Sequence, residues 1–454
     1  MNSKLKYVKI VALIGIFTFV FLYAEYLYVG MVSLTTSGEK AVTAQNYALG
    51  VSAVGFGISS FICGKCENVD RYIWEIIAAI VSIPCIFIVC VHVNYAVTFI
   101  SGMTLFLMLG IIGSSVFYKA VLMVDNNMYL GRVVGFSYTI GIMLQFLNNN
   151  IIKSLYIEAA VLSVFLIIIV VIMIKSQTVF SYSKNMNSNY KKSRLTGGLL
   201  IILVVFMTCI FSTLDNAVTL VHVDGVMDIG QWPRILLALS GCIAGIVFDI
   251  MNRNAMSYIM YCVMILSTIC IAVIRFSQPF VIGLVIFYMS AGFFAVFFTT
   301  AFMEISQYMK MPRLWAGLGR AVNNLTAALI TGGSLALLSS DNNILFIIVV
   351  LVIFVIVSTL TILYSSNRNA LMNDESEPDN MDNEEKIDNI AVMYSFTQRE
   401  KEVFDFLVNT DDNIQTIADN MFVSRRTLER YISAIYKKTG VKSRVSLINI
   451  FNNK

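Results

Sequence analysis

The sequence predicts an all-α protein: a polytopic membrane body followed by a small helical domain. Three observations support this fold class. Of the 454 residues, 57% are hydrophobic and 13% are charged, against about 25% charged residues in a typical soluble protein. Long apolar segments recur along residues 1–364, and amphipathic helical spacing replaces them after residue 395. The composition excludes a disordered chain, a secreted disulfide scaffold and a cytosolic enzyme.

Twelve apolar segments are expected to be membrane spans, because about 20 residues of α-helix cross the hydrocarbon core. They lie near residues 10–34, 46–63, 72–91, 95–118, 129–147, 155–174, 197–221, 233–250, 256–274, 279–303, 315–338 and 343–364. An even number of spans places both termini on one side. The loops of that side hold sixteen Lys and Arg residues, and the opposite loops and adjoining helix ends hold four: Lys40, Lys153, Arg234 and Arg275. This asymmetry predicts a multi-pass protein of the inner (cytoplasmic) membrane with both termini in the cytoplasm.

The membrane region is expected to consist of two halves, residues 1–174 and 197–364, joined by a polar cytoplasmic loop over 175–196. An internal repeat supports the division. The segment LGRVV at 130–134 returns 188 residues later as LGRAV at 318–322, each time at the start of the fifth span of its half.

A short loop motif follows the eighth span, with Gly245, then Asp249 four residues later, then the basic Arg253. The first-half version, from Gly64 to Arg71, is stretched and degenerate. With its two six-span halves and this partial motif, the region 1–364 resembles the major facilitator superfamily. The resemblance implies a central ligand site between pseudosymmetric halves.

Carboxylates inside membrane spans are costly and therefore mark candidate functional sites. Glu25 lies in the first span, and Asp215 lies beside Asn216 in the seventh, its pseudo-equivalent; Glu158 lies near the start of the sixth. One interpretation places Glu25, Asp215 and Asn216 in a central water-accessible cavity that holds a cation, a proton or a polar ligand. The other makes them structural groups that neighbouring Tyr, Asn or Gln side chains satisfy. Aromatic residues of the tenth span either line a pocket or pack against helices and lipid: Phe287, Tyr288, Phe293, Phe294, Phe297 and Phe298.

The sequence contains no evident catalytic or metal-binding constellation. The Cys63-Cys66 pair has neither a second such pair nor a nearby His, whereas a structural zinc site normally needs four ligands. His222 stands near Asp228 in a predicted outer loop, which is either an external pH or metal sensor or simply solvated. We therefore expect no catalytic residue, no metal, no cofactor and a function other than catalysis.

Residues 365–394 are predicted to be an acidic flexible linker. They contain eight Asp and Glu against two Lys and Arg, few apolar residues and Pro378. Such a composition does not bury enough apolar surface to fold.

Residues 395–454 show the pattern of a helix-turn-helix. Thr397 and Glu400 form a capping box at the start of the first helix. After a short second helix and a tight turn, Ser424 is the expected N-cap of a basic helix that Gly440 ends. A short helix, a brief turn and a basic helix are typical of DNA-binding helix-turn-helix domains.

The same region carries an ordered series of short motifs. They are Thr397, Arg399-Glu400, Glu402-Val403, Ile417-Ala418, Ser424, Thr427-Leu428, Lys437-Lys438, Gly440-Val441 and Ser443-Arg444. In order and spacing they resemble the DNA-binding domain of LuxR-type regulators, except that the usual Gly after the first helix is missing and the loop 409–412 carries one extra residue. The resemblance implies binding to double-stranded DNA as a homodimer.

By that resemblance, Glu429, Arg430 and Ser433 face base edges in the major groove, where Glu accepts from cytosine and Arg pairs with guanine. Arg425 lies on the same exposed basic face. Other residues are expected to hold phosphates and set the register: Ser424, Arg426, Thr427, Tyr431, Lys437 and Lys438.

Together these features predict a membrane-tethered one-component transcriptional regulator. A small molecule or ion bound by the membrane region would alter DNA binding by the cytoplasmic domain, and the expected partners are DNA, the lipid bilayer and this unknown effector. The alternative is a secondary transporter of the major facilitator type with an added gene-regulatory DNA-binding domain.

Overall fold

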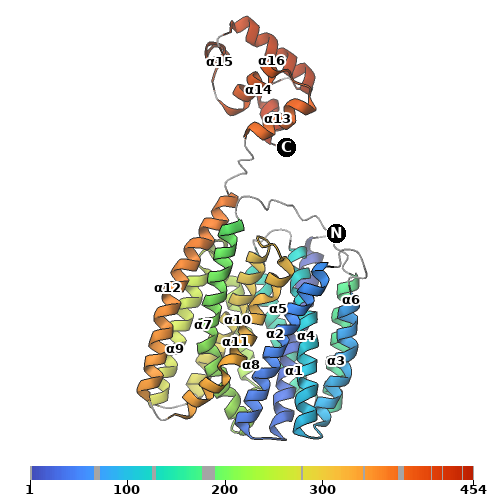
Figure 1. Cartoon of the computed structure of the whole chain (residues 1–454), viewed down its shortest axis with the longest axis vertical. Coiled ribbons are helices and arrows are strands. Elements are labelled where there is room, and N and C mark those ends of the chain that lie inside the picture. Colours follow the sequence, from blue (N-terminus) through green and yellow to red (C-terminus); the bar gives the residue numbers. More distant parts are fainter. Residues whose placement is uncertain are drawn as a thin grey trace. The chain divides into compact units, whose positions relative to one another are not determined.

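The computed structural model describes residues 3–65, 72–124, 129–175, 190–277, 280–340, 343–376, 383–410, 412–421, 423–441 and 443–452 (Figure 1). Within these ranges the chain is helical and has no strand. Its contacts divide it into two units, which we call the body, Met1–Leu371, and the head, Met372–Lys454.

The body contains one helix for each of the twelve predicted spans. In chain order they are α1 (Ser3–Ser33), α2 (Gly38–Lys65), α3 (Ile73–Val91), α4 (Tyr95–Met123), α5 (Leu130–Ile151), α6 (Leu155–Lys175), α7 (Tyr190–Val223), α8 (Pro233–Phe248), α9 (Met256–Ser277), α10 (Phe280–Ser306), α11 (Pro312–Ser339) and α12 (Asn343–Ser376). Among the described residues, nine of these helices are long and apolar enough to cross a membrane, and α8 and part of α9 form shorter apolar helices. The remaining one, α2, buries polar side chains such as Gln45, Asn46 and Ser52.

The two predicted halves correspond to α1–α6 and α7–α12. The polar loop between them is shorter than expected, because α7 begins at Tyr190 rather than at 197; residues 176–189 lie outside the described chain. The halves meet where α2 packs on α11 and α5 packs on α8. A Cβ atom added to Gly135 of α5 would lie 2.6 Å from the Cα of Gly245 on α8. Only glycine allows this close approach of the two backbones, which gives the Gly of the loop motif a packing role.

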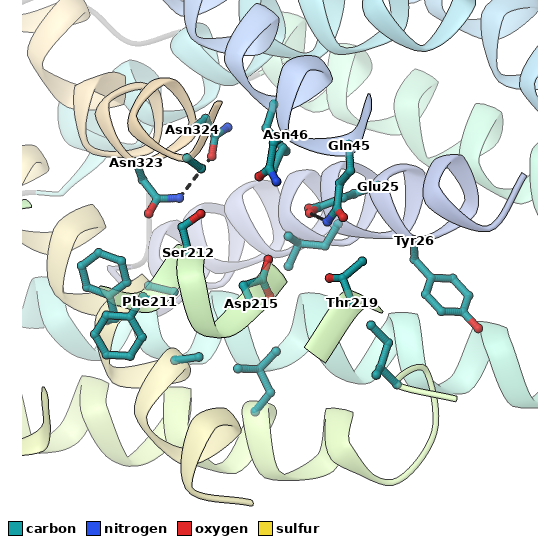
Figure 2. Close-up of a pocket in the computed structure, with 18 of the residues that line it drawn as sticks. Glu25, Tyr26, Gln45, Asn46, Phe211, Ser212, Asp215, Thr219, Asn323 and Asn324 are labelled. Carbon is teal, nitrogen blue, oxygen red and sulfur yellow. Dashed lines mark hydrogen bonds between the residues drawn. The ribbon is translucent and has the colours of Figure 1, made fainter. Parts of the chain in front are cut away.

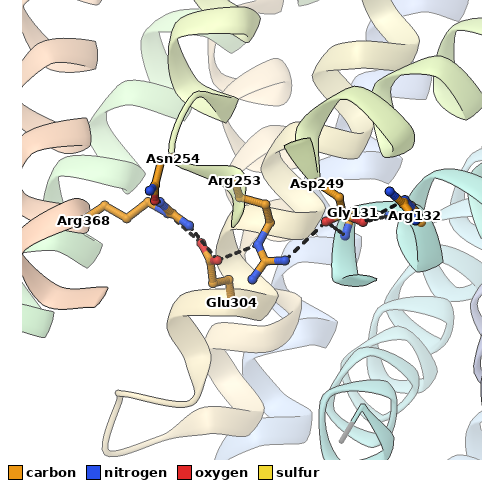
Figure 3. Close-up of polar contacts among 7 residues, drawn as sticks. All are labelled: Gly131, Arg132, Asp249, Arg253, Asn254, Glu304 and Arg368. Carbon is orange, nitrogen blue, oxygen red and sulfur yellow. Dashed lines mark hydrogen bonds and ion pairs between the residues drawn. The ribbon is translucent and has the colours of Figure 1, made fainter. Parts of the chain in front are cut away.

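A polar network ties the halves together at the terminal face, by which we mean the face of the body where α1 begins and α12 ends. Asp249 accepts hydrogen bonds from the backbone amides of Gly131, at 2.9 Å, and Arg132, at 2.7 Å, at the N-terminus of α5 (Figure 3). A helix N-terminus has unpaired N–H groups and favours negative charge. The motif carboxylate of one half therefore caps a helix of the other half.

The network continues from Asp249 to the end of α12. Arg253, in the short 3₁₀ helix η2 (Ile250–Arg253), lies 3.3 Å from Asp249 and 2.6 Å from Glu304, and Glu304 also binds Arg368 at 2.8 Å (Figure 3). Arg253, Glu304 and Arg368 are buried. Removing one partner of such a buried group leaves an uncompensated charge, at a cost of about 3–5 kcal/mol.

The last helix of the body extends beyond residue 364, where the sequence placed the end of the last span. Helix α12 continues to Ser376, and Ser365, Arg368 and Leu371 are buried in the body. The prediction stopped where polar residues begin. The ion pair between Arg368 and Glu304 keeps this polar turn of α12 inside the body.

The repeated LGR segments do not both start a helix. Residues 130–132 begin α5, so that Arg132 lies beside Asp249 at the terminal face. Residues 318–320 lie two turns inside α11, because that helix already begins at Pro312, a residue well suited to a first helical turn. Arg320 therefore lies within the body, whereas the sequence placed it in a loop.

The head is a bundle of five short helices: α13 (Asn383–Met393), α14 (Gln398–Asn409), α15 (Ile414–Asn420), α16 (Arg425–Thr439) and α17 (Arg444–Asn452). The three predicted caps are confirmed. Thr397 and Glu400 form the capping box of α14, Ser424 caps the start of α16, and Gly440 ends it with a φ of 75°. The sequence-predicted core of α16, Leu428, Ile432 and Ile435, is buried. Phe422, in the expected tight turn, lies outside the described residues.

Helix α13 corrects the prediction of a flexible linker over 365–394. Its residues Ile387 and Ile390 are buried in the core of the head, against α14 and α17. Lys401 of α14 also pairs with Asp388. The acidic composition hid an apolar face whose members are three residues apart and so lie on one side of a helix. The head therefore begins earlier than residue 395.

We expect Ile390→Ala to destabilise the head by about 2–5 kcal/mol, the usual cost of truncating a buried Ile. The measurement is urea unfolding of a fragment of residues 383–454. Asn389→Ala is the matched control, because Asn389 is exposed on the same helix. Equal stability of the two variants would show that α13 does not belong to the core.

A second prediction concerns Glu400, which accepts hydrogen bonds at 2.6 Å from both Lys438 Nζ and the Thr397 amide. Its slight burial would raise its pKa, but these hydrogen bonds outweigh that effect and hold the pKa below its ordinary value of about 4.5. The stabilisation is therefore complete above pH 4.5 and is lost as the pH falls through the lower, folded-state pKa. Thermal unfolding of the 383–454 fragment should show this loss, and Glu400→Gln should remove that part of the pH dependence. An unchanged pH profile in the Gln variant would contradict the assignment.

Candidate functional site

A cavity of about 160 Å³ lies between the two halves of the body. Helices α1, α2 and α5 line it from the first half, and α7, α8, α10 and α11 line it from the second. The volume exceeds several-fold the roughly 10–15 Å³ needed to hold one water molecule. The cavity is therefore large enough for a small organic ligand, and it lies where the halves of a transporter-like body enclose one.

Four ionisable side chains with opposite charges line this cavity. Glu25 of α1 and Asp215 of α7 supply carboxylates, and Arg234 of α8 and Arg320 of α11 supply guanidinium groups. Figure 2 shows Glu25 and Asp215 on neighbouring helices around the cavity, with Ser212 and Thr219 on the same helix as Asp215. If all four groups are ionised, their formal charges sum to zero.

The four groups differ in how far protein partners satisfy them. Glu25 accepts a hydrogen bond of 2.6 Å from Gln45 on α2 (Figure 2). Asp215, Arg234 and Arg320 make no hydrogen bond and no ion pair with any residue that the structure describes, and Arg234 Nε is buried without a partner. The guanidinium of Arg320 lies 5.7 Å from the ring centre of Phe21 and 5.3 Å from that of Phe298. These rings hold Arg320 in place by cation–π contacts and leave its N–H donors unused.

Sequence reasoning missed both arginines. It counted Arg234 with the outer helix ends and Arg320 with the cytoplasmic loops. The available signal was the same one that identified Glu25, namely an ionisable residue inside an apolar helix. For Arg320 that signal was missed because the residue, near the start of the predicted span, was counted with the preceding loop.

Asn216 lies outside the cavity lining, in contrast to the prediction for it. It accepts a hydrogen bond from Asn46 of α2 at 2.8 Å and donates one to Ser334 of α11 at 2.6 Å. A similar bond of 2.9 Å joins Asn324 of α11 to Ser52 of α2. Asn46 and Asn324 themselves line the cavity, so these amide contacts join the two halves at its wall. In this structure Asn216 contacts a lining residue, Asn46, rather than the cavity itself.

The other membrane residues chosen from the sequence divide between cavity and core. Of the aromatic residues of α10, Phe287, Tyr288, Phe294 and Phe298 line the cavity, whereas Phe293 and Phe297 pack against Phe248 of α8. Glu158 is buried and does not line the cavity. The side chains of Cys63 and Cys66 lie outside the described residues, and no group of three or more potential metal ligands occurs among the described ones.

The halves also touch at the face opposite the terminal face. Tyr26 of α1 donates a hydrogen bond of 3.0 Å to Asp228 in the loop between α7 and α8, and its ring stacks on His222. Partial burial would raise the pKa of Asp228, but hydrogen bonds from Gly230, Gln231 and Tyr26 outweigh it and lower the pKa. His222 Nδ1 lies 3.8 Å from Asp228. The predicted outer loop is thus a contact between the halves rather than a freely solvated segment.

The head presents a basic surface along α16. Arg426, Arg430, Ser433 and Lys437 are exposed, whereas Thr427 and Tyr431 are half-buried. Glu429 is exposed but forms an ion pair of 3.0 Å with Arg425, one turn earlier. Ser424 accepts from the amide of Thr427 as the N-cap. The exposed arginines provide donors at the start and middle of a helix that is solvent-accessible along one face.

Lys438 is engaged within the head in the absence of DNA. Its ammonium donates to Glu400 and, at 2.9 Å, to the carbonyl of Ser395. Lys438 thus contacts the capping box of α14, and its role as a phosphate contact stays a prediction. Arg444, which sequence reasoning noted only as a motif residue, donates to the carbonyls of Leu407, at 2.8 Å, and Asp412, at 2.6 Å. It thereby connects α17 to the end of α14 and the loop that follows it.

Known proteins resemble the two units separately. Residues 394–451 match the family GerE, "Bacterial regulatory proteins, luxR family", and no curated protein sequence matches the chain. Three solved structures resemble the membrane part. The E. coli fucose:proton symporter FucP has a TM-score of 0.53 and 8% identity, over 81% of this chain and 99% of that chain. The proton:xylose symporter XylE has a TM-score of 0.52 and 10% identity, over 80% of this chain and 95% of that chain, and the human organic anion transporter MFSD10 has a TM-score of 0.51 and 11% identity, over 81% and 99% of the two chains. The chain is therefore a multi-pass membrane protein that joins a body with the major facilitator superfamily fold to a C-terminal LuxR-type DNA-binding domain.

Proposed function

We propose that this protein is a membrane-tethered one-component transcriptional regulator. The body binds a small effector in its central cavity, and the head binds promoter DNA through α16 as a homodimer. The observation that carries the proposal is the presence, on one chain, of a DNA-binding domain and of a membrane body whose cavity contains charged groups without protein partners. Charged groups inside a membrane region are costly unless a ligand or water satisfies them.

Contacts between the halves supply a route from effector to head. They occur at both faces of the body, through Asp249 and the start of α5 at one and through Tyr26 and Asp228 at the other. A ligand that contacts both halves changes the relative stability of two arrangements of the body, one that keeps the Asp249 contact and one that keeps the Tyr26 contact. The end of α12 belongs to the network of Asp249 through Arg368 and Glu304. A change in that network therefore reaches the helix that precedes the head.

The orientation follows from the distribution of basic residues. Arg320 and Arg234 lie in the cavity and do not count as loop residues. Fifteen Lys and Arg then remain on the side of the termini, against three on the other side. The positive-inside rule thus favours an inner-membrane protein with the head in the cytoplasm.

A second candidate function, secondary transport combined with gene regulation, has its own support. Contacts between the halves at both faces are what an alternating-access transporter needs to close each face in turn. A sensor needs only to bind its ligand, whereas a transporter must move it. Uptake of effector into liposomes that contain purified protein, with and without the head, separates the two. Concentrative or exchange uptake would favour transport, and saturable binding without uptake would favour sensing.

We predict that Arg430 reads bases. Arg430→Ala in the 383–454 fragment should lose about 1–3 kcal/mol of affinity for a duplex selected from a random pool by the wild-type head, and little affinity for random DNA. Lys437→Ala should weaken both alike and reduce the salt dependence. Equal losses on both duplexes for Arg430→Ala would make it a phosphate contact. Titrations at several salt concentrations supply the measurement.

We also predict that Glu25 belongs to the effector site. Glu25→Gln preserves the shape of the side chain and removes its charge, so the protein should reach normal abundance. A reporter driven by the target promoter should then no longer respond to effector, or should respond only at a much higher concentration. Glu39→Gln is the control, because Glu39 is an exposed carboxylate at the start of α2. A normal dose curve for Glu25→Gln would mean that Glu25 is structural.

A further inference from the structure

We propose that the cavity ligand is a small zwitterion of the amino acid class, with one carboxylate, one ammonium group and an apolar side chain. This inference rests on the proposed function, since it names the chemistry of the same effector site. Arg320 and Arg234 would bind the carboxylate, Asp215 would bind the ammonium group, and aromatic residues of α10 would contact the side chain.

The first support is that groups of both signs lack protein partners in one cavity. Asp215 on α7 has no hydrogen bond or ion pair within the described chain, and the same is true of Arg234 on α8 and Arg320 on α11. Elsewhere in the body the arginines Arg253, Arg313 and Arg368 each pair with a carboxylate within 3.3 Å. The cavity arginines thus lack the ion pairs that these three arginines form.

The charge balance distinguishes a zwitterion from simpler ligands. The two carboxylates and two guanidinium groups of the cavity already sum to zero. An organic anion would satisfy the arginines but leave Asp215 unpaired and give the cavity a net negative charge. An organic cation would satisfy Asp215 but leave the arginines unpaired and give the cavity a net positive charge. A neutral sugar would leave both signs without a counter-charge. A zwitterion satisfies both signs and preserves the balance, which matters because a charge without a counter-charge is unfavourable inside a membrane region.

The apolar part of the cavity accounts for the side chain. Phe294 stacks on Phe211 at 4.5 Å between ring centres and meets Phe298 edge-on, and all three residues line the cavity together with Phe287. This aromatic wall belongs to the second half, which also supplies Asp215 and both arginines. A volume of about 160 Å³ exceeds roughly tenfold the 10–15 Å³ that one water molecule needs, which leaves room for a ligand as small as a single amino acid.

The test uses the purified full-length protein in detergent and a matched set of probes. Thermal unfolding is first measured with each of the twenty common L-amino acids. The best of them is then compared with its analogue without the amino group and its analogue without the carboxyl group; for phenylalanine these are 3-phenylpropionate and 2-phenylethylamine. We expect the amino acid to bind at least roughly tenfold more tightly than either analogue, because each analogue leaves one charged side chain of the cavity without a counter-charge.

Two variants test which cavity residue binds the ammonium group of the ligand and which binds its carboxylate. Asp215→Asn should remove the advantage of the amino acid over its analogue without the amino group, while both still bind. Arg320→Gln should instead remove the advantage over the analogue without the carboxyl group. These comparisons are made within each variant, so a general loss of stability does not imitate them. Glu39→Gln should preserve both preferences.

The possible failures are distinguishable. If no amino acid stabilises the protein, or if an analogue, L-fucose or D-xylose binds as tightly as the best amino acid, the zwitterion inference is wrong. The reporter experiment with the target promoter then still tests the proposed regulatory function by itself. If an amino acid binds with the expected preferences but leaves the reporter unchanged, the inference holds and the proposed regulatory function is wrong.

Discussion

The free energy needed to place a charge inside a membrane determines where charged side chains lie in the body of this protein. Charged side chains enter the helices at two kinds of place. At the terminal face, Asp249, Arg253, Glu304 and Arg368 satisfy one another and a helix N-terminus. In the central cavity, the side chains of Asp215 and two arginines have no partner among the residues that the structure describes. The same cost stabilises the contacts of the first group and, under the proposed function, makes the second group a site for a ligand, since only a ligand or water can satisfy it.

Much of the architecture was predictable because it depends on strong, local signals. Twelve apolar segments identified twelve helices, and caps such as Thr397, Ser424 and Gly440 were readable because a single side chain or a single glycine conformation determines each one. Glu25 and Asp215 could be chosen as candidates because a carboxylate in an apolar segment stands out. Their role in binding an effector stays a prediction.

The contacts that could not be read from the sequence are those that depend on the tertiary structure. Asn216 resembles Asp215 in sequence position, but one residue corresponds to about 100° of rotation on a helix, and this rotation turns Asn216 toward α2 and α11. Lys438 belongs to a basic pair, yet it reaches Glu400, 38 residues earlier. Helix α13 escaped notice because only its contacts with α14 and α17 stabilise its two isoleucines in an acidic segment. No local pattern contains this information.

The inclusion of α13 in the head limits how far the DNA-binding surface reaches. Only residues 377–382 separate the end of α12 from the start of α13, and a chain of that length, fully extended, spans no more than about 25 Å. Under the proposed function, the head cannot diffuse to a distant promoter, so the promoter must come to the membrane. The half-sites of such operators lie about 34 Å apart, so two bodies must be close neighbours in the bilayer before both heads engage one operator. Lateral encounter of bodies in the membrane is then a step in gene regulation, and the local density of the protein sets the rate of DNA capture.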